Sequence, residues 1–191
     1  MFVPEPVTVR VPAKVNVYLG VGPREDNGYH RLATVFQSIS VYDEIKVTAA
    51  QEFTIVGEGK WADRIPTDST NLAWKAAHMV AAAYELPADI CVSINKSIPV
   101  AAGLAGGSAD GAATLVACNA YWGGALPHDA LVEMAAELGS DVPFMLSGGC
   151  ALGVNRGDVL SPVMTRGIFH WLLATFNEGL GTPEIYARLD E

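Results

Sequence analysis

The sequence is short of positive charge and of charge in general. Its 191 residues include 12 Lys and Arg against 21 Asp and Glu, which gives a formal net charge of −9, and only 17% of the residues are charged. Nucleic acids and anionic membranes are bound by basic surfaces, so this composition excludes both as general partners. Half of the residues are hydrophobic, so we expect a folded chain. A site for an anion must then be built locally, from backbone N–H groups and a few lysines.

The sequence also lacks the patterns of disulfide scaffolds, zinc sites and membrane spans. Three cysteines lie far apart without a CxxC pair, and four histidines show no ligand spacing such as HExxH. We therefore expect reduced thiols and no metal site formed by the protein alone. No stretch approaches about 20 consecutive apolar residues, and the first residues contain no signal-peptide-like run. These absences predict a soluble, cytoplasmic protein.

Strand patterns are grouped early in the chain and helical patterns follow them. Alternating or β-branched apolar residues predict strands over 7–11, 15–19, 40–48, 52–56, 90–94 and 169–176, with apolar pieces at 144–146 and 151–154. Helical spacing predicts helices over 70–84, 112–121, 128–138 and 182–189. Pro12 separates the first two strands, because its ring removes a ladder donor. Without a steady βαβ alternation, the predicted fold class is α+β.

A glycine-rich segment stands immediately before the predicted helix 112–121. Gly103, Gly106, Gly107 and Ser108 form a loop whose backbone N–H groups could surround one anion, with help from the positive end of the helix dipole. A loop that merely turns tightly before a buried helix has the same composition. The segment fits neither GxxxxGK[ST] nor GxGxxG, and no GxSxG elbow surrounds Ser108.

The pattern that remains is Pro-x-x-x-Gly-Leu-x-Gly-Gly-Ser-x-Asp over residues 99–110. It resembles the ATP loop of the GHMP kinase superfamily, which includes galactokinase, homoserine kinase and mevalonate kinase. Three further segments carry the resemblance: Pro-Ala-Lys-Val-Asn at 12–16, Asp-Asn-Gly-Tyr-His at 26–30 and Leu-Gly-Ser-Asp-Val-Pro at 138–143. The four motifs in this order cover essentially the whole chain. The resemblance implies the GHMP kinase N-terminal domain, an α+β fold of the ribosomal protein S5 domain 2-like type.

For catalysis, the resemblance implies a pair formed by Lys14 and Asp141. Asp141 would take the proton of the acceptor hydroxyl, while Lys14 would orient it and stabilise charge on the transferred phosphoryl group. Taken alone, Asp141 equally fits a turn residue before Pro143, and Lys14 a solvent-facing strand residue.

For binding, the resemblance implies ATP as cofactor, with Mg²⁺ carried mainly by the ATP phosphates and not by protein ligands. The expected ATP-binding residues are Pro99, Val100, Ala101, Ala102, Gly103, Leu104, Ala105, Gly106, Gly107, Ser108, Ala109, Asn71 and Lys96. Asn71 and Lys96 fit exposed helix or strand residues equally well. The expected substrate-binding residues are Asn16, Tyr29, His30, Thr182 and Tyr186, of which Tyr29 and Tyr186 would stack on a cytosine ring and His30 would hydrogen-bond it.

The GHMP branch that the chain resembles most phosphorylates the 2-hydroxyl of 4-diphosphocytidyl-2-C-methyl-D-erythritol, a cytidine diphosphate-linked methylerythritol, in the non-mevalonate isoprenoid pathway. That small molecule is the expected partner of a monomer or weak dimer. The alternatives are another GHMP small-molecule kinase, or a truncated nucleotide-binding module with little or no activity. Full-length members carry a second domain, so we expect residues 1–165 to form the ATP-binding domain and 166–191 to start the connection to a C-terminal domain missing from this chain. Weak substrate binding and slow turnover are expected of the 191 residues alone.

Overall fold

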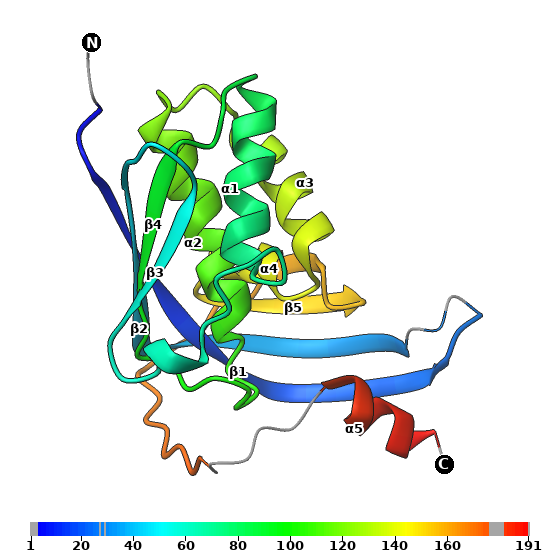
Figure 1. Ribbon diagram of the computed structural model, residues 1–191. Coiled ribbons are helices and arrows are strands. Elements are labelled where there is room, and N and C mark those ends of the chain that lie inside the picture. The colour runs from blue at the N-terminus through cyan, green and yellow to red at the C-terminus, as the bar shows by residue number, and fades with distance from the viewer. Residues whose placement is uncertain (1–3, 27, 29, 176–181, 191) are drawn as a thin grey trace.

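A six-stranded mixed sheet organises the molecule (Figure 1). The computed structural model describes residues 4–26, 28, 30–175 and 182–190. The strands are β1 (Val7–Arg24), β2 (His30–Ala49), β3 (Thr54–Glu58), β4 (Ile90–Asn95), β5 (Cys150–Asn155) and β6 (Val159–Pro162). The helices are the 3₁₀ turn η1 (Ala62–Arg64) and α1 (Leu72–Ala83), α2 (Gly106–Tyr121), α3 (His128–Leu138), α4 (Val142–Ser147) and α5 (Thr182–Leu189).

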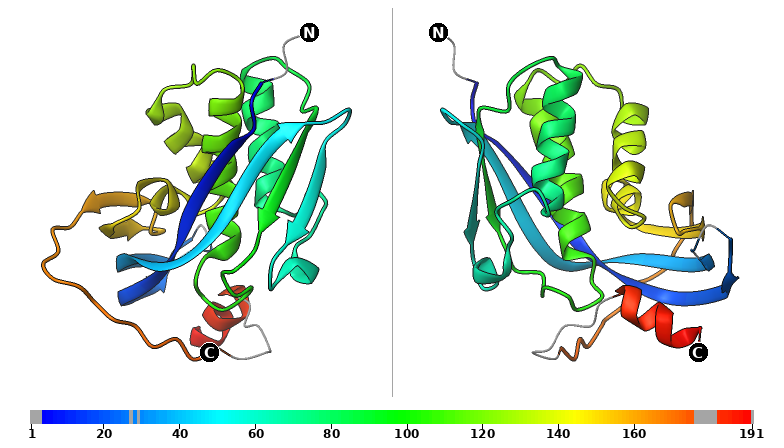
Figure 2. Two further views of the ribbon diagram at one scale, coloured as in Figure 1. Left: turned by 90° about the vertical axis from the view of Figure 1, so that its left-hand side faces the viewer. Right: turned by 45° about the vertical axis from the view of Figure 1, so that its right-hand side comes forward.

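Strand β2 is the centre of the sheet, because it pairs along both of its edges. One edge pairs antiparallel with β1 over most of its length. The other edge pairs antiparallel with β5 over residues 32–37 and with β4 over residues 44–49. Strand β3 extends the sheet parallel to β4, and β6 extends it antiparallel to β5. The far ends of β1 and β2 thus project beyond β3 and β4 as an arm (Figures 1 and 2).

Proline 12 does not interrupt the first strand, contrary to the prediction of two strands over 7–11 and 15–19. Strand β1 is continuous, and the pairing with β2 shifts register between Pro12 and Ala13. A proline is tolerated at such an irregularity in the pairing. Among the described strands β1 pairs only with β2, so the other edge of β1 needs no backbone N–H donor at Pro12. The free edge is available to a loop.

The helices cover one face of the sheet (Figure 2). Alanine-rich α1 and α2 pack against each other, and α2 also packs against β1 and β2, which the small side chains permit at close range. The core between the layers contains the fully buried Ile45, Val92, Ile94, Leu115 and Phe144. Helix α5 lies apart from this layer, along the far end of β1 (Figures 1 and 2).

The predicted helix over 128–138 is confirmed as α3, and the predictions over 70–84 and 182–189 agree closely with α1 and α5. The helix predicted over 112–121 begins earlier, at Gly106, within the glycine-rich segment. Glycine has low helix propensity, but here packing holds the first turn, since Gly106 is buried against Ile98. The strand predicted over 169–176 is wrong for 169–175, which have no regular structure and are largely exposed.

In the described part of the chain, no helix combines the length and the apolar character that a membrane crossing requires.

Candidate active site

Lys14 and Asp141 are 127 positions apart in the sequence, and the fold brings their side chains together. Lys14 lies on β1, and Asp141 is the residue before α4. The Lys14 ammonium Nζ is 3.4 Å from Asp141 Oδ2. The lysine is 6% exposed, whereas the Asp141 side chain is 30% exposed and can meet a ligand. The pair thus consists of a buried cation and an accessible carboxylate.

Asn16 orients this pair from the same strand. Lys14 Nζ donates a hydrogen bond of 2.7 Å to Asn16 Oδ1, as expected for residues two apart that share a strand face. The Asn16 amide Nδ2 donates to Thr34 Oγ1 at 2.7 Å, and that hydroxyl donates to the Tyr18 carbonyl at 2.8 Å. Thr34 is fully buried on β2. It was missed in the sequence, because only the register of β1 against β2 shows that it supports Asn16.

An aromatic ring lies beside the lysine. Lys14 Nζ is 5.3 Å from the centroid of the Phe36 ring, within the range of a cation–π interaction. Phe36 stacks on Phe144 of α4, with ring centroids 4.9 Å apart. These contacts connect β1, β2 and the helix that follows Asp141, so the hydrophobic core fixes the separation of the two charged groups.

The glycine-rich loop lies against the free edge of β1. The backbone N–H of Lys14 donates to the carbonyl of Leu104 at 3.3 Å, which places the loop next to the Lys14–Asp141 pair. Ala101, Gly103 and Ala105 have positive φ angles of 57°, 73° and 57°. For the two alanines this left-handed conformation costs energy, and such strain is retained where the surrounding structure requires it.

The start of α2 presents unpaired N–H groups. Ala109 N–H donates to the Ala105 carbonyl at 2.9 Å, so the N–H groups of Gly106, Gly107 and Ser108 precede the first intrahelical bond. A left-handed residue followed by helical ones aims successive N–H groups into one concavity, which suits a phosphate. A Cβ on Gly107 would meet nothing within 4 Å, so this face is open.

The other loop residues divide into an exposed rim and a buried base. Ala101, Ala102, Gly103 and Gly107 are exposed, Pro99, Val100, Ala105 and Ser108 are half-buried, and Leu104, Gly106 and Ala109 are buried.

Asn71 and Lys96 are not the exposed residues that the alternative interpretation of the sequence predicted. Asn71 is buried and caps α1: its Oδ1 accepts from Ala73 N–H at 2.8 Å and its Nδ2 donates to the Pro66 carbonyl at 2.7 Å. Lys96 is 2% exposed and contacts Asp43, Asp110 and the Gly106 carbonyl. In the described structure both side chains are engaged with protein groups, and Lys96 reaches the end of the glycine-rich loop through the Gly106 carbonyl.

His30 and Tyr186 are brought together at the far end of the arm. Their rings stack with centroids 5.2 Å apart. His30 Nδ1 is 2.8 Å from the Gly22 carbonyl, and its Nε2 is 3.3 Å from Asp190 Oδ1. Burial, and secondarily the charge of Asp141, raise the pKa of Tyr186. Tyr29 lies outside the described residues, and Thr182 begins α5, where its side chain is not described.

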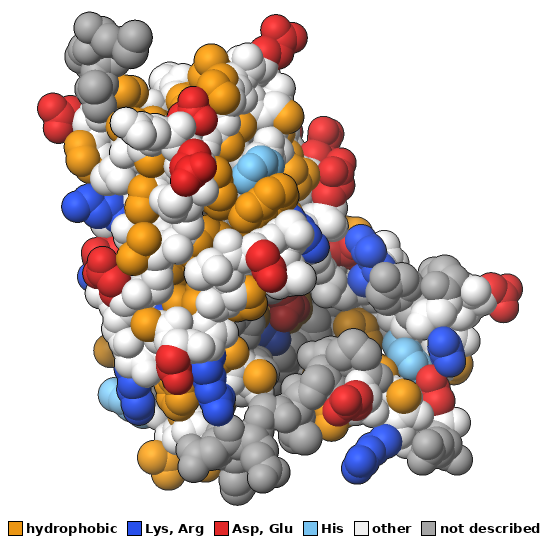
Figure 3. All heavy atoms as spheres, viewed as in Figure 1, with side chains coloured by type: hydrophobic (Ala, Val, Ile, Leu, Met, Phe, Trp, Pro, Cys, Tyr) orange, Lys and Arg blue, Asp and Glu red, His pale blue; other side chains and the backbone are white. Residues whose placement is uncertain are grey.

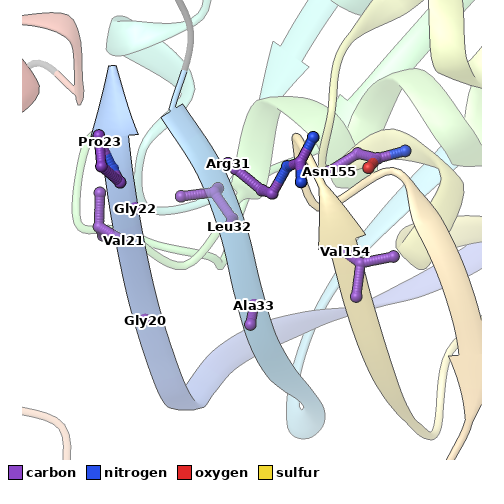
Figure 4. A pocket seen from close by; sticks show the side chains of 9 residues that line it. All are labelled: Gly20, Val21, Gly22, Pro23, Arg31, Leu32, Ala33, Val154 and Asn155. Atoms are coloured by element: carbon purple, nitrogen blue, oxygen red, sulfur yellow. The ribbon is translucent and has the colours of Figure 1, made fainter. Parts of the chain in front are cut away.

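The surface is hollowed between the helices and the arm (Figure 3). A separate hollow of about 630 Å³ lies on the arm itself, between β1, β2 and the end of β5 (Figure 4). Arg31 reaches across it toward Asn155, and Gly20, Ala33 and Val154 form its wall. Lys14, Asp141 and the glycine-rich loop do not line it, so we do not assign the proposed chemistry there. Within the described ranges, no three His, Cys, Asp or Glu side chains are grouped as metal ligands.

Residues 71–149 match the family model for the GHMP kinases N terminal domain. The chain is 52% identical over 183 residues to 4-diphosphocytidyl-2-C-methyl-D-erythritol kinase of Mycobacterium marinum, covering 96% of this chain and 57% of that protein. It is 50% identical over 188 residues to the enzyme of the same name from Rhodococcus jostii, covering 98% of this chain and 60% of that protein.

The crystal structure of a 4-(cytidine 5'-diphospho)-2C-methyl-D-erythritol kinase superimposes with a TM-score of 0.67 at 34% identity, over 82% of this chain and 55% of that one. This chain thus spans somewhat over half the length of the relatives it matches. The agreement in sequence and in α+β architecture with these kinases extends over most of its residues, and the chain contains a GHMP kinases N terminal domain at residues 71–149.

Proposed function

We propose that the chain provides the ATP-binding and catalytic residues for phosphorylation of the 2-hydroxyl of 4-diphosphocytidyl-2-C-methyl-D-erythritol. The observation that carries the proposal is the Lys14–Asp141 pair, which lies beside a glycine-rich helix N-terminus. A cation, a carboxylate and a phosphate cradle are the groups that phosphoryl transfer to an alcohol requires. The names of the relatives at about 50% identity support the choice of acceptor.

The loop would hold the nucleotide through its backbone. The open N–H groups of Gly106, Gly107 and Ser108 fit the phosphate chain of ATP, and the rim at 101–103 would lie over it. Mg²⁺ would come with the phosphates, where it neutralises charge on their oxygens. Because the protein is acidic overall, this local array of N–H groups together with Lys14 would supply the attraction for a polyanion.

Asp141 would act as the general base. As the bond between the acceptor oxygen and the γ-phosphorus forms, the bond to the β–γ bridging oxygen breaks, and ADP leaves with that electron pair. The proton of the hydroxyl passes to the accessible Asp141 carboxylate. The buried Lys14 holds Asp141 in place and stabilises the negative charge of the transferred group.

The cytidine end of the acceptor would lie toward the arm. Tyr186, held in place by its stacking on the buried side chain of His30, offers a flat ring with a polar edge, which suits a nucleobase, and Asn16 would contact the polyol part. Tyr29 and Thr182 remain predictions of the sequence for the same end. Homoserine, mevalonate or a sugar has no base for these rings to recognise, which favours the cytidine-linked acceptor over the substrates of other GHMP kinases.

The test is a kinase assay with ATP, Mg²⁺ and the cytidine-linked acceptor, combined with binding measurements of both substrates. General-base catalysis contributes about 10²- to 10⁴-fold, so Asp141→Asn should lower turnover by at least about 100-fold. Asp129→Asn, on the exposed start of α3, is the matched control and should leave turnover unchanged. Near-wild-type turnover in Asp141→Asn would refute the assigned role. Binding of both substrates without turnover would favour a nucleotide-binding module, the alternative that the partial coverage of the relatives keeps open.

A further inference from the structure

Lys96 connects three separate elements through one buried ammonium group. It follows the end of β4, and its Nζ donates to Asp43 Oδ2 on β2 at 2.7 Å and to the Gly106 carbonyl of α2 at 2.8 Å. It also donates to Asp110, one turn further along α2. The three protons of the ammonium therefore have three protein acceptors. One of them is the first carbonyl of the helix whose N–H groups form the phosphate cradle.

Asp43 fixes the other end of this connection. Its carboxylate is fully buried, and its second oxygen, Oδ1, accepts the backbone N–H groups of Ser97 at 2.7 Å and Ile98 at 2.8 Å. Those two residues begin the chain segment that leads into the glycine-rich loop. Asp43 therefore holds the start of the loop directly and its end through Lys96.

Asp110 makes the group asymmetric. Two buried carboxylates face one lysine, and Asp110 Oδ1 has no hydrogen-bond partner within the described part of the chain. Burial raises the pKa of Asp110 to about 8, while Lys96 opposes and Asp43 adds to the rise. Asp110, whose Oδ1 accepts no hydrogen bond from a described residue, therefore carries the proton at neutral pH. With Asp110 neutral, the network has one positive group, Lys96, and one ionised carboxylate, so its charges balance.

Space at the helix start is matched to this arrangement. A Cβ on Gly106 would lie 3.0 Å from Lys96 Nζ and 3.0 Å from Ile98 Cγ2, so the backbone of α2 approaches the ammonium as closely as glycine allows. On the opposite side, Gly107 faces open space. The first turn of α2 thus has a fixed inner side and a free outer side that would face the ligand.

We propose that Lys96, Asp43 and Asp110 form a positioning network that holds the N–H groups of residues 106–108 in the orientation for phosphate binding, without touching the nucleotide. The proposal rests on the proposed function in so far as it takes a nucleotide phosphate as the ligand. Buried ion pairs are weak contributors to net stability compared with apolar side chains of similar size, and their better-attested role is to specify one arrangement. Here the specified arrangement is the orientation of the helix start relative to Lys14.

The test compares Lys96→Met and Asp110→Asn with the control Lys46→Met, whose lysine is exposed on β2. The readouts are MgADP affinity by calorimetry and amide exchange of Ala109 and Lys14, whose hydrogen bonds depend on the loop. Lys96→Met should weaken MgADP binding about tenfold, the equivalent of one charged hydrogen bond, and speed exchange at both amides. Asp110→Asn imitates the protonated acid and should keep affinity within about twofold. The exchange of α3 amides should stay unchanged in all variants.

The other possible results of this experiment also test the network. A folded Lys96→Met chain with unchanged affinity and unchanged Ala109 exchange would overturn the network. If Lys96→Met does not fold, Asp43→Asn takes its place, because its amide NH₂ must face either the ammonium or the two N–H groups, and the same two effects are expected. A wild-type chain that binds no MgADP would refute the proposed function, and the exchange rates would still decide the network.

Discussion

Asp110→Asn should change how the stability of the protein depends on pH. In the wild type, the Asp110 contribution to the free energy of unfolding is expected to fall as pH rises from about 4 to about 8. The variant should lack this contribution. The reason is burial: the folded protein keeps Asp110 protonated until the pKa of about 8, whereas the unfolded chain releases that proton near the ordinary value of 3.8. An asparagine has no proton to release in either state.

The sign and size follow from proton binding. Between the two pKa values the folded state binds one proton more than the unfolded state, so each unit of rising pH costs up to about 1.4 kcal/mol of stability. Above pH 8 both states are ionised at this position, and the contribution becomes constant. The charged groups that face Asp110 are Lys96 and Asp43, and both are present in wild type and variant.

Urea unfolding at pH 5, 6, 7 and 8 measures the effect as the wild-type value minus that of the variant, because all other titrations then cancel. The difference should become more negative by about 1 kcal/mol per pH unit. Asp129→Asn, at an exposed carboxylate, should show no such slope. Parallel curves for wild type and Asp110→Asn would refute a neutral Asp110, and with it the charge balance assigned to the network.

Three further outcomes are expected from the packing. Gly106→Ala should lower the free energy of unfolding by about 1–3 kcal/mol, because its Cβ would meet Lys96 Nζ at 3.0 Å. Gly107→Ala has open space around its Cβ and should raise the free energy of unfolding by about 0.5–1 kcal/mol. Urea unfolding of both variants should therefore give changes of opposite sign. Burial raises the pKa of Cys118 to about 12, so one of the three thiols should resist a thiol reagent at pH 8 until the chain is unfolded, and three fast-reacting thiols would contradict it. Phe144→Ala should lower the free energy of unfolding by about 3–5 kcal/mol, because the ring is fully buried and its removal leaves a cavity in the core.

Much of the fold followed from local patterns. Alternation and helical spacing predicted α3, α1 and most strands, because each element has one face in the core and one toward solvent. The sequence pattern failed where a segment becomes a strand only if a neighbouring strand pairs with it. Residues 169–175 are apolar enough for a strand but pair with no strand in the described structure, while the short strand β6 forms because β5 lies beside it.

The candidate site was predictable as a set of residues and not as an arrangement. The motifs identified Lys14, Asp141 and the glycine-rich loop, and the structure places them side by side. Thr34 and Asp43 carried no signal of their own, since a threonine and an aspartate within a strand are ordinary residues. Their importance depends on which side chains lie opposite them.

By itself, the sequence determined the α+β class, the acidic net charge and the local chemistry of the loop, because composition, periodicity and glycine content act over a few neighbouring residues. Only the tertiary structure decided that α2 begins at Gly106, that Lys96 is buried between two carboxylates and that Asp141 faces Lys14. These features join positions far apart in the chain, and their energies come from packing and from charges removed from water. Such terms exist only once β1, β2, β4 and α2 have come together.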